Sequence, residues 1–216
     1  MRAKGSRPQR LLVALEGPDG SGKTTLARLL LVHCSSRGIP ARSYWLRGSH
    51  LLASLLLRLL SRFEVLRGPC NPYYWVCVPA GLRGLWAHVE FWSLAPRLVI
   101  RGLLSRLGGL LVSDRGALDF VVWVVVTLGY PGFVSSLYGR FLLGLARREL
   151  VVYLRADPEV LEARADVPRE FLRRECAVYE VLSRHYARAS LDTGRCRPAQ
   201  CLAELVKGLR DAVADA

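Results

Sequence analysis

One glycine-rich loop constrains this chain more than any other segment. The run Gly17-Pro18-Asp19-Gly20-Ser21-Gly22-Lys23-Thr24 matches the spacing G-x-x-x-x-G-K-[ST]. An apolar run at residues 11–15 precedes it, and leucines at helical spacing follow it, namely Leu26, Leu29 and Leu30. Glycines let successive backbone N–H groups turn toward phosphate oxygens, and the positive end of the following helix points at the same place. The loop therefore predicts a nucleotide phosphate site between a strand and a helix.

The loop residues have separate roles in phosphate chemistry. Lys23 is placed to reach the β and γ phosphates of a nucleotide, and the Thr24 hydroxyl is placed to ligate Mg²⁺. The set expected around the phosphates of ATP is Gly17, Pro18, Asp19, Gly20, Ser21, Gly22, Lys23, Thr24 and Thr25. A glycine-rich turn can match this spacing by accident, but correct strand and helix flanks make an accident much less frequent.

Strand-like and helical segments alternate along the chain, which predicts an α/β fold in which helices cover both faces of a parallel sheet. The five expected strands are residues 11–15, 42–46, 110–113, 150–154 and 189–191. Most of them are continuous apolar runs, as strands buried on both faces require. We therefore expect one three-layer α/β/α domain over residues 1–216, with a five-stranded parallel sheet.

The middle of the chain is less regular. Residues 51–60 predict a helix, and residues 67–84 predict a Gly- and Pro-rich loop that carries Tyr73, Tyr74 and Trp75. A loop of this length is either a lobe over the active site or a disordered flap. Pro96 is expected to kink or split a helix over residues 85–107.

Basic residues are in excess, with 31 Lys and Arg against 18 Asp and Glu and a net charge of +13. Only Lys4, Lys23 and Lys207 are lysines, so the excess is almost entirely arginine, which binds phosphate through a bidentate fork. An arginine-rich composition also follows from a GC-rich genome or a heat-adapted organism, and sparse Asn, Gln and Met agree with the latter. The hydrophobic fraction of 51% excludes a disordered chain.

The six cysteines, at positions 34, 70, 77, 176, 196 and 201, have no Cys-x-x-Cys spacing, so we do not expect a zinc site. The default is free buried thiols, and the alternative is a Cys196–Cys201 disulfide in a heat-loving cell. Residues 1–10 are basic but are not followed by the long apolar run of a secretory signal. The longest apolar stretch, residues 120–128, is too short to span a membrane. We expect a cytoplasmic protein with no membrane partner.

Segments along almost the whole chain resemble the thymidylate kinase family of P-loop nucleoside monophosphate kinases. Residues 16–25, Glu-Gly-Pro-Asp-Gly-Ser-Gly-Lys-Thr-Thr, look like the first motif of that family and are the most specific match. Residues 113–115, Ser-Asp-Arg, resemble its Asp-Arg motif, and residues 157–160, Asp-Pro-Glu-Val, resemble the segment before its mobile lid. Residues 171–179 and 191–192 are similar to its post-lid helix and last strand.

The resemblance implies a P-loop kinase that transfers the γ-phosphoryl group of ATP to dTMP, with Mg²⁺ as cofactor. It implies a helical acceptor-binding region at about residues 47–107 and a short lid at about residues 164–174. The resemblance also implies that Thr24 ligates the Mg²⁺ ion and that Asp114 lies beside it. Asp19, Arg47 and Arg115 would position the acceptor. Among the lid arginines we expect Arg164 and Arg169 to stabilise the transferring phosphoryl group.

Each of these assignments has a structural alternative. Asp19 could be a turn former, Arg115 could form a surface ion pair with Asp114 or Asp119, and the lid arginines could be solvated helix residues. Members of the family are commonly homodimers, and the apolar helix over residues 120–128 suits either a dimer interface or a buried core.

The acceptor half departs from the family pattern. Gly48-Ser49 replaces the Glu-Pro that usually follows the arginine corresponding to Arg47, and Gly116 stands where an aromatic residue or histidine is common. The register of the base-recognising arginine falls on Ser93, with Arg97 one turn later. Either dTMP binds in a rearranged pocket, or the acceptor is another nucleotide, a nucleoside or a different small metabolite. The aromatic residues available to pack on a base there are Trp86, Phe91, Trp92, Tyr73, Tyr74 and Trp75.

Two other classes of protein compete with a kinase. A nucleic-acid-binding P-loop ATPase would explain the net charge, but we would expect a strand ending in Asp-Glu and a contiguous basic track. Here Arg115 follows Asp114, and the arginines are scattered along the chain, so a nucleic-acid partner is not expected. The other class is a P-loop interaction module without catalytic activity.

Overall fold

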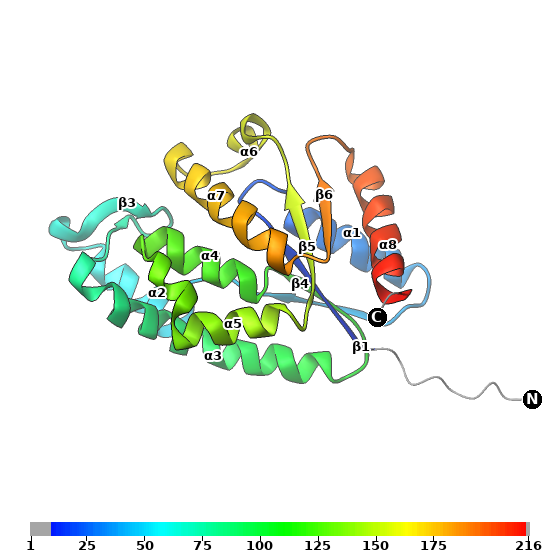
Figure 1. The fold of residues 1–216 in the computed structure, drawn as a ribbon, viewed down its shortest axis with the longest axis horizontal. Coiled ribbons are helices and arrows are strands. Elements are labelled where there is room, and N and C mark those ends of the chain that lie inside the picture. The colour runs from blue at the N-terminus through cyan, green and yellow to red at the C-terminus, as the bar shows by residue number, and fades with distance from the viewer. Residues whose placement is uncertain (1–9, 215–216) are drawn as a thin grey trace, which may run out of the picture.

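Five parallel strands form the central sheet of the structure, a computed structural model that describes residues 10–214 (Figure 1). The strands are β1 (Arg10–Glu16), β2 (Ala41–Trp45), β4 (Gly109–Asp114), β5 (Leu150–Arg155) and β6 (Ala189–Asp192). Their order in the sheet is β2-β4-β1-β5-β6. All five predicted strands are confirmed. Residues 1–9, which hold most of the basic N-terminal segment, lie outside the described residues.

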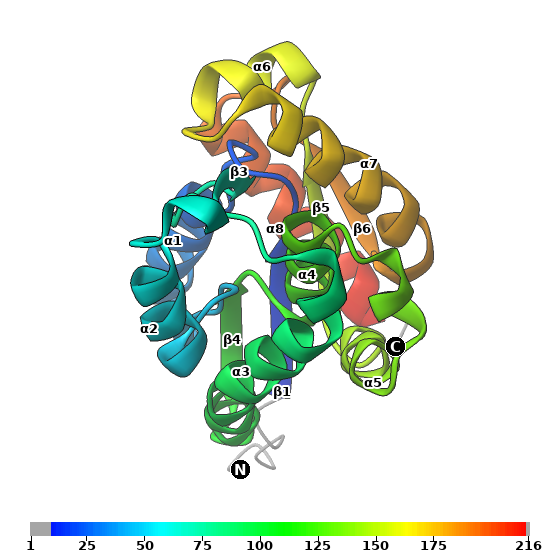
Figure 2. The same cartoon turned by 90° about the vertical axis from the view of Figure 1, so that its left-hand side faces the viewer.

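Helices cover both faces of this sheet (Figures 1 and 2). One layer contains α1 (Lys23–Ser35) and α8 (Pro198–Ala214), and the other contains α3 (Arg83–Ser105), α4 (Ala117–Leu128), α5 (Leu137–Ala146) and α7 (Arg169–Tyr186). Neighbouring β1 side chains point to opposite faces, so Val13 and Leu15 pack in the α1 layer and Ala14 packs in the α4 layer. This arrangement confirms the three-layer α/β/α fold.

The remaining elements lie at the ends and edges of these layers. They are α2 (Leu51–Leu60), α6 (Pro158–Arg164), the short strand β3 (Arg67–Asn71) and three 3₁₀ turns at Glu64–Leu66, Ala80–Leu82 and Pro131–Ser135. The helix predicted at residues 51–60 is confirmed. The segment predicted as a loop at residues 67–84 instead begins with β3, and its last two residues belong to α3.

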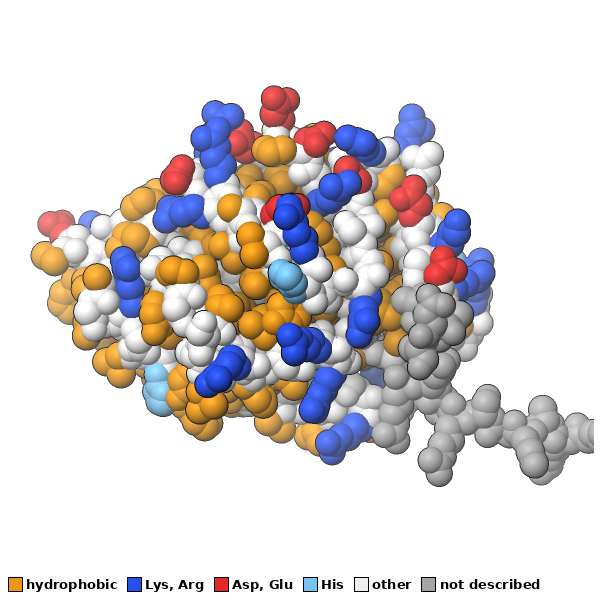
Figure 3. All heavy atoms as spheres, viewed as in Figure 1, with side chains coloured by type: hydrophobic (Ala, Val, Ile, Leu, Met, Phe, Trp, Pro, Cys, Tyr) orange, Lys and Arg blue, Asp and Glu red, His pale blue; other side chains and the backbone are white. Residues whose placement is uncertain are grey.

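Every residue of α4 is buried inside the single chain. A helix that is apolar on all sides needs this environment, so the core interpretation is confirmed and the use of residues 120–128 as a dimer interface is wrong. Exposed apolar side chains lie instead on the outer helices, where Leu52 and Leu55 of α2 and Val99 and Leu103 of α3 are more than half exposed. Figure 3 shows hydrophobic side chains between scattered basic side chains on one face of the molecule. No helix within residues 10–214 is long and apolar enough to cross a membrane.

Helix α3 continues through Pro96, so of the expected kink or split the split does not occur. Contacts with neighbouring elements hold the second half of the helix. Tyr44 Oη of β2 donates to the Arg97 carbonyl over 3.0 Å, and the Arg101 guanidinium forms a buried ion pair with Glu149.

Four of the six cysteines form disulfides, so the expectation of free thiols is wrong for them. Cys196–Cys201 is the bridge considered from the sequence, whereas Cys70–Cys77 was not anticipated. Both pairs have Cα atoms close enough for a disulfide, at 5.0 Å for Cys70–Cys77 and 5.4 Å for Cys196–Cys201. The sequence spacing could not reveal this, because the Cys70–Cys77 pair depends on the chain folding back after β3. Cys34 and Cys176 are free.

The burial of α4 leads to a stability prediction. Replacing the buried Phe120 with alanine should lower the free energy of unfolding by about 3–5 kcal/mol, because the core around α4 would have to collapse or keep a cavity. The matched control is Leu137→Ala on α5, where the side chain is 72% exposed, and this change should cost less than about 0.5 kcal/mol. Urea unfolding of both variants measures the difference, and equal losses would contradict the assignment of α4 to the core.

Candidate active site

The glycine-rich loop lies at the carboxyl end of β1, the central strand, where the topology of the sheet changes direction. From β1 the chain passes to β2 and β4 on one side, and it later crosses to β5 and β6 on the other. Ligands of open α/β sheets bind at such a point. Gly17 has a φ of 150°, and a side chain there would overlap the Leu154 carbonyl oxygen of β5. Glycine is therefore needed for the loop to turn away from the sheet.

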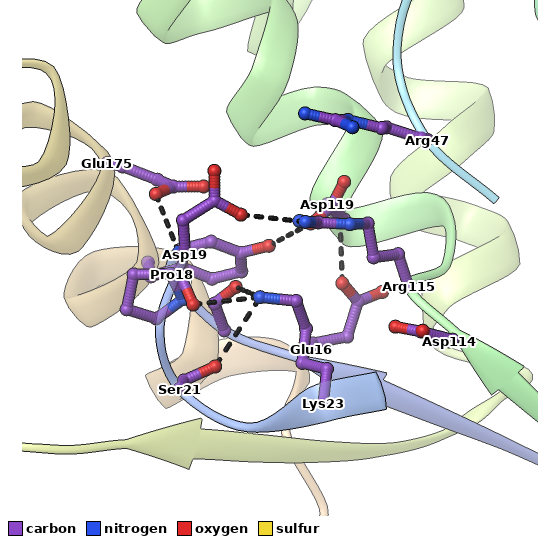
Figure 4. A network of polar contacts seen from close by, with 12 residues as sticks. Glu16, Pro18, Asp19, Ser21, Lys23, Arg47, Asp114, Arg115, Asp119 and Glu175 are labelled. Atoms are coloured by element: carbon purple, nitrogen blue, oxygen red, sulfur yellow. Dashed lines mark hydrogen bonds and ion pairs between the residues drawn. The ribbon is translucent and has the colours of Figure 1, made fainter. Parts of the chain in front are cut away.

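Lys23 is buried at the start of α1, and its ammonium group faces back into the loop (Figure 4). Its Nζ donates to the carbonyl oxygens of Gly17, at 2.6 Å, and Pro18, at 2.8 Å, and more weakly to Ser21 Oγ. Burial lowers the pKa of Lys23, and the nearby Arg115 charge lowers it further. A phosphate oxygen can replace these neutral acceptors and is a stronger partner for the ammonium group.

Thr24 and Asp114 lie side by side, at the start of α1 and the end of β4. Thr24 Oγ1 donates to Asp114 Oδ2 over 2.6 Å, and Asp114 Oδ1 is buried without a hydrogen-bond partner. A hydroxyl oxygen beside an unsatisfied carboxylate oxygen is a suitable pair for Mg²⁺, which completes its shell with water and phosphate oxygens. Between residues 10 and 214 no cluster of three or more His, Cys, Asp or Glu side chains could hold a metal by itself.

Arg115 is the centre of a buried ionic cluster. Its guanidinium group contacts Asp19 Oδ1 of the loop at 2.7 Å and Asp119 Oδ1 of α4 at 3.0 Å, and Tyr179 of α7 donates to the same Asp119 oxygen. Burial opposes the charged form, but the two aspartates raise the pKa of Arg115 above its usual value. The ion pair with Asp119 that we weighed is present, but it is buried, and Arg115 does not pair with Asp114.

Asp19 is held at both its backbone and its side chain. Its N–H donates to Glu175 Oε2 of α7 at 2.9 Å, and its carboxylate accepts from Arg115 and from the Tyr73 hydroxyl. Burial alone would raise the pKa of Asp19, but the charges of Arg115 and Lys23 keep it well below its usual value. Asp19 is therefore more than a turn former, because it joins the loop to α7, β4 and the segment after β3.

Glu175 was not found from the sequence. Burial raises its pKa to about 8, and the Asp19 charge adds to this effect. The signal that could have revealed it is its position within the apolar stripe of α7, between Phe171 and Leu182, both of which are buried. A carboxyl group at a core position of a helix needs a specific partner, and here the partner is the backbone of the phosphate loop.

A small pocket of about 200 Å³ lies beside this cluster. It is lined by Trp45, Arg47, Gly48, Ser49, His50, Leu51, Ser54, Tyr73, Tyr74 and Trp123. The Arg47 guanidinium carbon lies 3.5 Å from the centre of the Tyr73 ring, and no carboxylate of residues 10–214 forms an ion pair with Arg47. The expected acceptor residue Arg47 is therefore a cation beside a cavity.

Trp92 and Arg97, the two other expected acceptor residues, do not line this pocket. The Trp92 side chain is 58% exposed on the outer surface of α3. Arg97 donates to the Trp45 carbonyl over 3.0 Å and lies near the rings of Tyr44 and Trp45. Ser93 holds the start of α2, because its hydroxyl accepts from the Ala53 N–H. Ser93 and Arg97 were assigned from their register before the Asp-Arg motif, and Trp92 was assigned as an aromatic residue available to a base. In the structure Arg97 reaches the pocket only through its contact with Trp45.

The departures from the family pattern have local physical causes. A side chain on Gly48 would overlap the Trp123 ring, so only glycine fits there. Ser49 binds Glu90 through its N–H, at 2.8 Å, and its hydroxyl, at 2.6 Å. A methyl group on Gly116 would lie only 2.6 Å from Glu16 Oε1 and 2.7 Å from a Glu149 oxygen.

A larger cavity of about 430 Å³ lies on the other side of the loop. It is lined by Gly20, Gly22, Thr25, Leu26, Arg164, Thr193, Cys196, Pro198 and Cys201. Its wall therefore includes the Cys196–Cys201 disulfide, and Arg164 donates to the Thr193 carbonyl over 3.3 Å. The cavity opens beside the residues that would surround the phosphates, so it can take the rest of a nucleotide.

The expected lid, residues 164–174, comprises the last residue of α6, a short connection at residues 165–168 and the start of α7. Of its arginines, only Arg164 reaches the cavity. Arg169 is exposed and pairs with Glu162 at 2.6 Å, and Arg173 contacts the same carboxylate at 3.8 Å. Arg169 is therefore a solvent-exposed helix residue, which was the structural alternative to a role in phosphoryl transfer.

The chain matches no known protein family in a scan of family models, and a search of curated proteins finds no significant relative.

The raised pKa of Glu175 predicts a pH dependence of stability. A carboxyl group that is neutral in the folded protein and ionised in the unfolded chain stabilises fully below about pH 4.5. That contribution is lost as the pH rises toward 8, at up to about 1.4 kcal/mol per pH unit. Glu175→Gln retains a neutral side chain with a carbonyl oxygen for the Asp19 N–H, so between pH 5 and 8 its melting temperature should fall less steeply than that of the wild type. Parallel profiles would contradict a neutral Glu175.

Proposed function

We propose that the protein is an ATP-dependent phosphotransferase that converts ATP and dTMP to ADP and dTDP. The observation that carries this proposal is the position of the glycine-rich loop between two cavities. The larger cavity borders Gly20 and Gly22, and the smaller one contains Arg47 and is reached from the loop through Asp19 and Tyr73. A donor nucleotide on one side and an anionic acceptor on the other would meet beside Lys23.

The donor side supports binding of a nucleoside triphosphate. The phosphates would lie in the loop at the N-terminus of α1, where unpaired backbone N–H groups and Lys23 favour negative charge. The nucleoside would occupy the cavity of about 430 Å³, which lies within the size range of small-molecule sites. Arg164 is the lid arginine in position to contact the bound donor.

The transfer step needs few chemical groups from the protein. An oxygen of the acceptor phosphate forms a bond to the γ-phosphorus while the bond from that phosphorus to the β–γ bridging oxygen breaks, and ADP leaves with that oxygen. No general base is required, because the attacking phosphate oxygen is already anionic near neutral pH. Lys23 stabilises the charge on the donor, and Arg47 and Arg115 orient the acceptor.

Thr24 and Asp114 are the residues that we expect to hold Mg²⁺ together with the donor phosphates. The ion would neutralise charge that develops on the phosphate oxygens. The buried unpaired Asp114 Oδ1 supports this assignment, since a carboxylate oxygen without a partner is costly in the absence of a cation.

The size of the acceptor pocket favours a second candidate function. A pocket of about 200 Å³ is smaller than the cavities of about 300 Å³ and above that usually hold drug-sized ligands. A kinase for a different, smaller phosphorylated or hydroxylated metabolite would use the same donor site and the same arginines.

We also infer a cytoplasmic location, where ATP and nucleoside monophosphates are available. Two disulfides are unusual in that compartment except in hyperthermophiles, whose intracellular proteins retain them. The disulfides therefore support the heat-adapted interpretation of the composition.

Removal of the Lys23 ammonium group tests the proposed activity. Lys23→Ala should reduce ADP formation by more than about 100-fold, because this group would act on charge that develops during transfer. The control is Lys207→Ala, which changes the only other lysine within residues 10–214. The assay combines ATP and Mg²⁺ with dTMP, dUMP, UMP, CMP, AMP, GMP or thymidine. Absence of turnover with every monophosphate would defeat the nucleoside monophosphate kinase proposal.

The placement of the acceptor arginine leads to a kinetic prediction. Arg47→Gln should raise the KM for the acceptor about tenfold or more and leave the KM for ATP nearly unchanged, because a charge-assisted hydrogen bond to the acceptor is lost. Trp92→Ala and Arg97→Ala should leave both values within about twofold. A large increase in the KM for the acceptor in either variant would instead support Trp92 or Arg97 as an acceptor-binding residue.

A further inference from the structure

Tyr73 occupies a position that the proposed reaction does not explain. It comes from the segment after β3, far in sequence from the loop, yet its hydroxyl donates to the Asp19 carboxylate. The Arg47 guanidinium covers its ring, and the ring centre lies 5.6 Å from that of Trp123 on α4. Tyr73 thus contacts two of the groups expected to position the acceptor, Asp19 and Arg47.

The segment that carries Tyr73 is a closed hairpin, residues 67–77. The Cys70–Cys77 disulfide closes it, and backbone hydrogen bonds join Gly68 to Trp75 over 3.0 Å and Trp75 to Asn71 over 2.8 Å. Asn71 Oδ1 also accepts from the Tyr73 N–H at 3.2 Å. These covalent and hydrogen-bonded constraints hold the backbone that directs the tyrosine toward Asp19.

The position of Tyr73 determines how much room an acceptor has. Its ring is part of the wall of the 200 Å³ pocket, together with Arg47 and Trp123. Another part of the wall is the turn at Gly48 and Ser49, which is fixed by Glu90 and by close contact with Trp123. The Tyr73 ring lines the pocket and its hydroxyl reaches Asp19, so a smaller side chain at position 73 would enlarge the space for an acceptor toward the loop.

We propose that Tyr73 is a specificity-determining residue that restricts the acceptor site to small ligands, and that the disulfide-closed hairpin holds it in place. The proposal rests on the assignment of this pocket to the acceptor of the proposed function. It predicts that a pyrimidine monophosphate is preferred to a bulkier purine monophosphate, and that the preference is set by the tyrosine ring and not by its hydroxyl.

The test compares the affinities of dTMP and dGMP for wild type and variants, measured by isothermal titration calorimetry. Tyr73→Ala should shift the ratio of dissociation constants at least tenfold toward dGMP, because removal of the ring joins the pocket to the space beside Asp19. Tyr73→Phe keeps the ring and should leave the ratio within about threefold of wild type. Trp75→Ala is the matched control, since Trp75 lies in the same hairpin, is 56% exposed and does not line the pocket.

A second variant tests the hairpin without changing the pocket wall. Cys70→Ser combined with Cys77→Ser removes the disulfide and should shift the ratio in the same direction as Tyr73→Ala, by at least threefold. Full retention of the preference in this variant would overturn the role of the closed hairpin. An unchanged ratio in Tyr73→Ala, or binding of neither nucleotide to any variant, would overturn the role of Tyr73.

The binding assay separates this inference from the proposed activity. Calorimetry needs no phosphoryl transfer, so wild-type protein that binds dTMP but forms no ADP would defeat the kinase proposal alone. Conversely, rapid ADP formation with an unaltered dTMP to dGMP ratio in Tyr73→Ala would defeat the specificity proposal alone.

Discussion

The candidate site is organised around the Arg115 guanidinium group, held between Asp19 and Asp119. Its side chain is only 15% exposed, so the charge depends on these two carboxylates for its stability. The Arg115 backbone has a φ of 73°, a left-handed conformation that costs a non-glycine residue about 1–2 kcal/mol. Its N–H donates to the Leu15 carbonyl of β1, and its carbonyl accepts from Ser113 Oγ, which supports this conformation.

This ionic cluster joins elements that are distant in the sequence. Asp119 lies in the first turn of α4 and its N–H donates to Glu16 Oε2 at the end of β1, so the buried helix and the central strand are connected beneath the loop. Helix α7 contributes twice, because Tyr179 binds Asp119 and Glu175, one turn earlier, binds the Asp19 backbone. Helices α4 and α7 and the glycine-rich loop therefore share one set of contacts centred on Asp19 and Asp119.

Much of the fold could be predicted because buried parallel strands leave a strong sequence signal. Continuous apolar runs marked most of the five strands, and the loop spacing located Lys23, Thr24 and, with the Asp-Arg pair, Asp114. The residues that were missed are Glu90 and Glu175, whose partners Ser49 and Asp19 lie more than 40 positions away in the chain. Tyr73 was expected only as an aromatic residue near the acceptor, and its contact with Asp19 was not predicted. An acidic residue in a helix usually faces solvent, so only its place in the apolar stripe could have marked Glu175. The hairpin that carries Tyr73 depends on a disulfide that sequence spacing does not specify.

The net positive charge of the chain is not found among the groups around the glycine-rich loop. The buried and partly buried ionisable groups below and around the loop comprise six carboxyl groups and three cationic groups. They are Glu16, Asp19, Asp114, Asp119, Glu149 and Glu175 against Lys23, Arg101 and Arg115. Burial raises the pKa of Glu16 and of Glu175, which favours the neutral form of both carboxyl groups. The surplus of arginine therefore lies mainly on the surface, where it supplies a long-range attraction for polyanions that salt screens. Close to the loop, a bound anion would instead meet hydrogen-bond donors in fixed positions. Arg115, for example, is held by the carboxylates of Asp19 and Asp119.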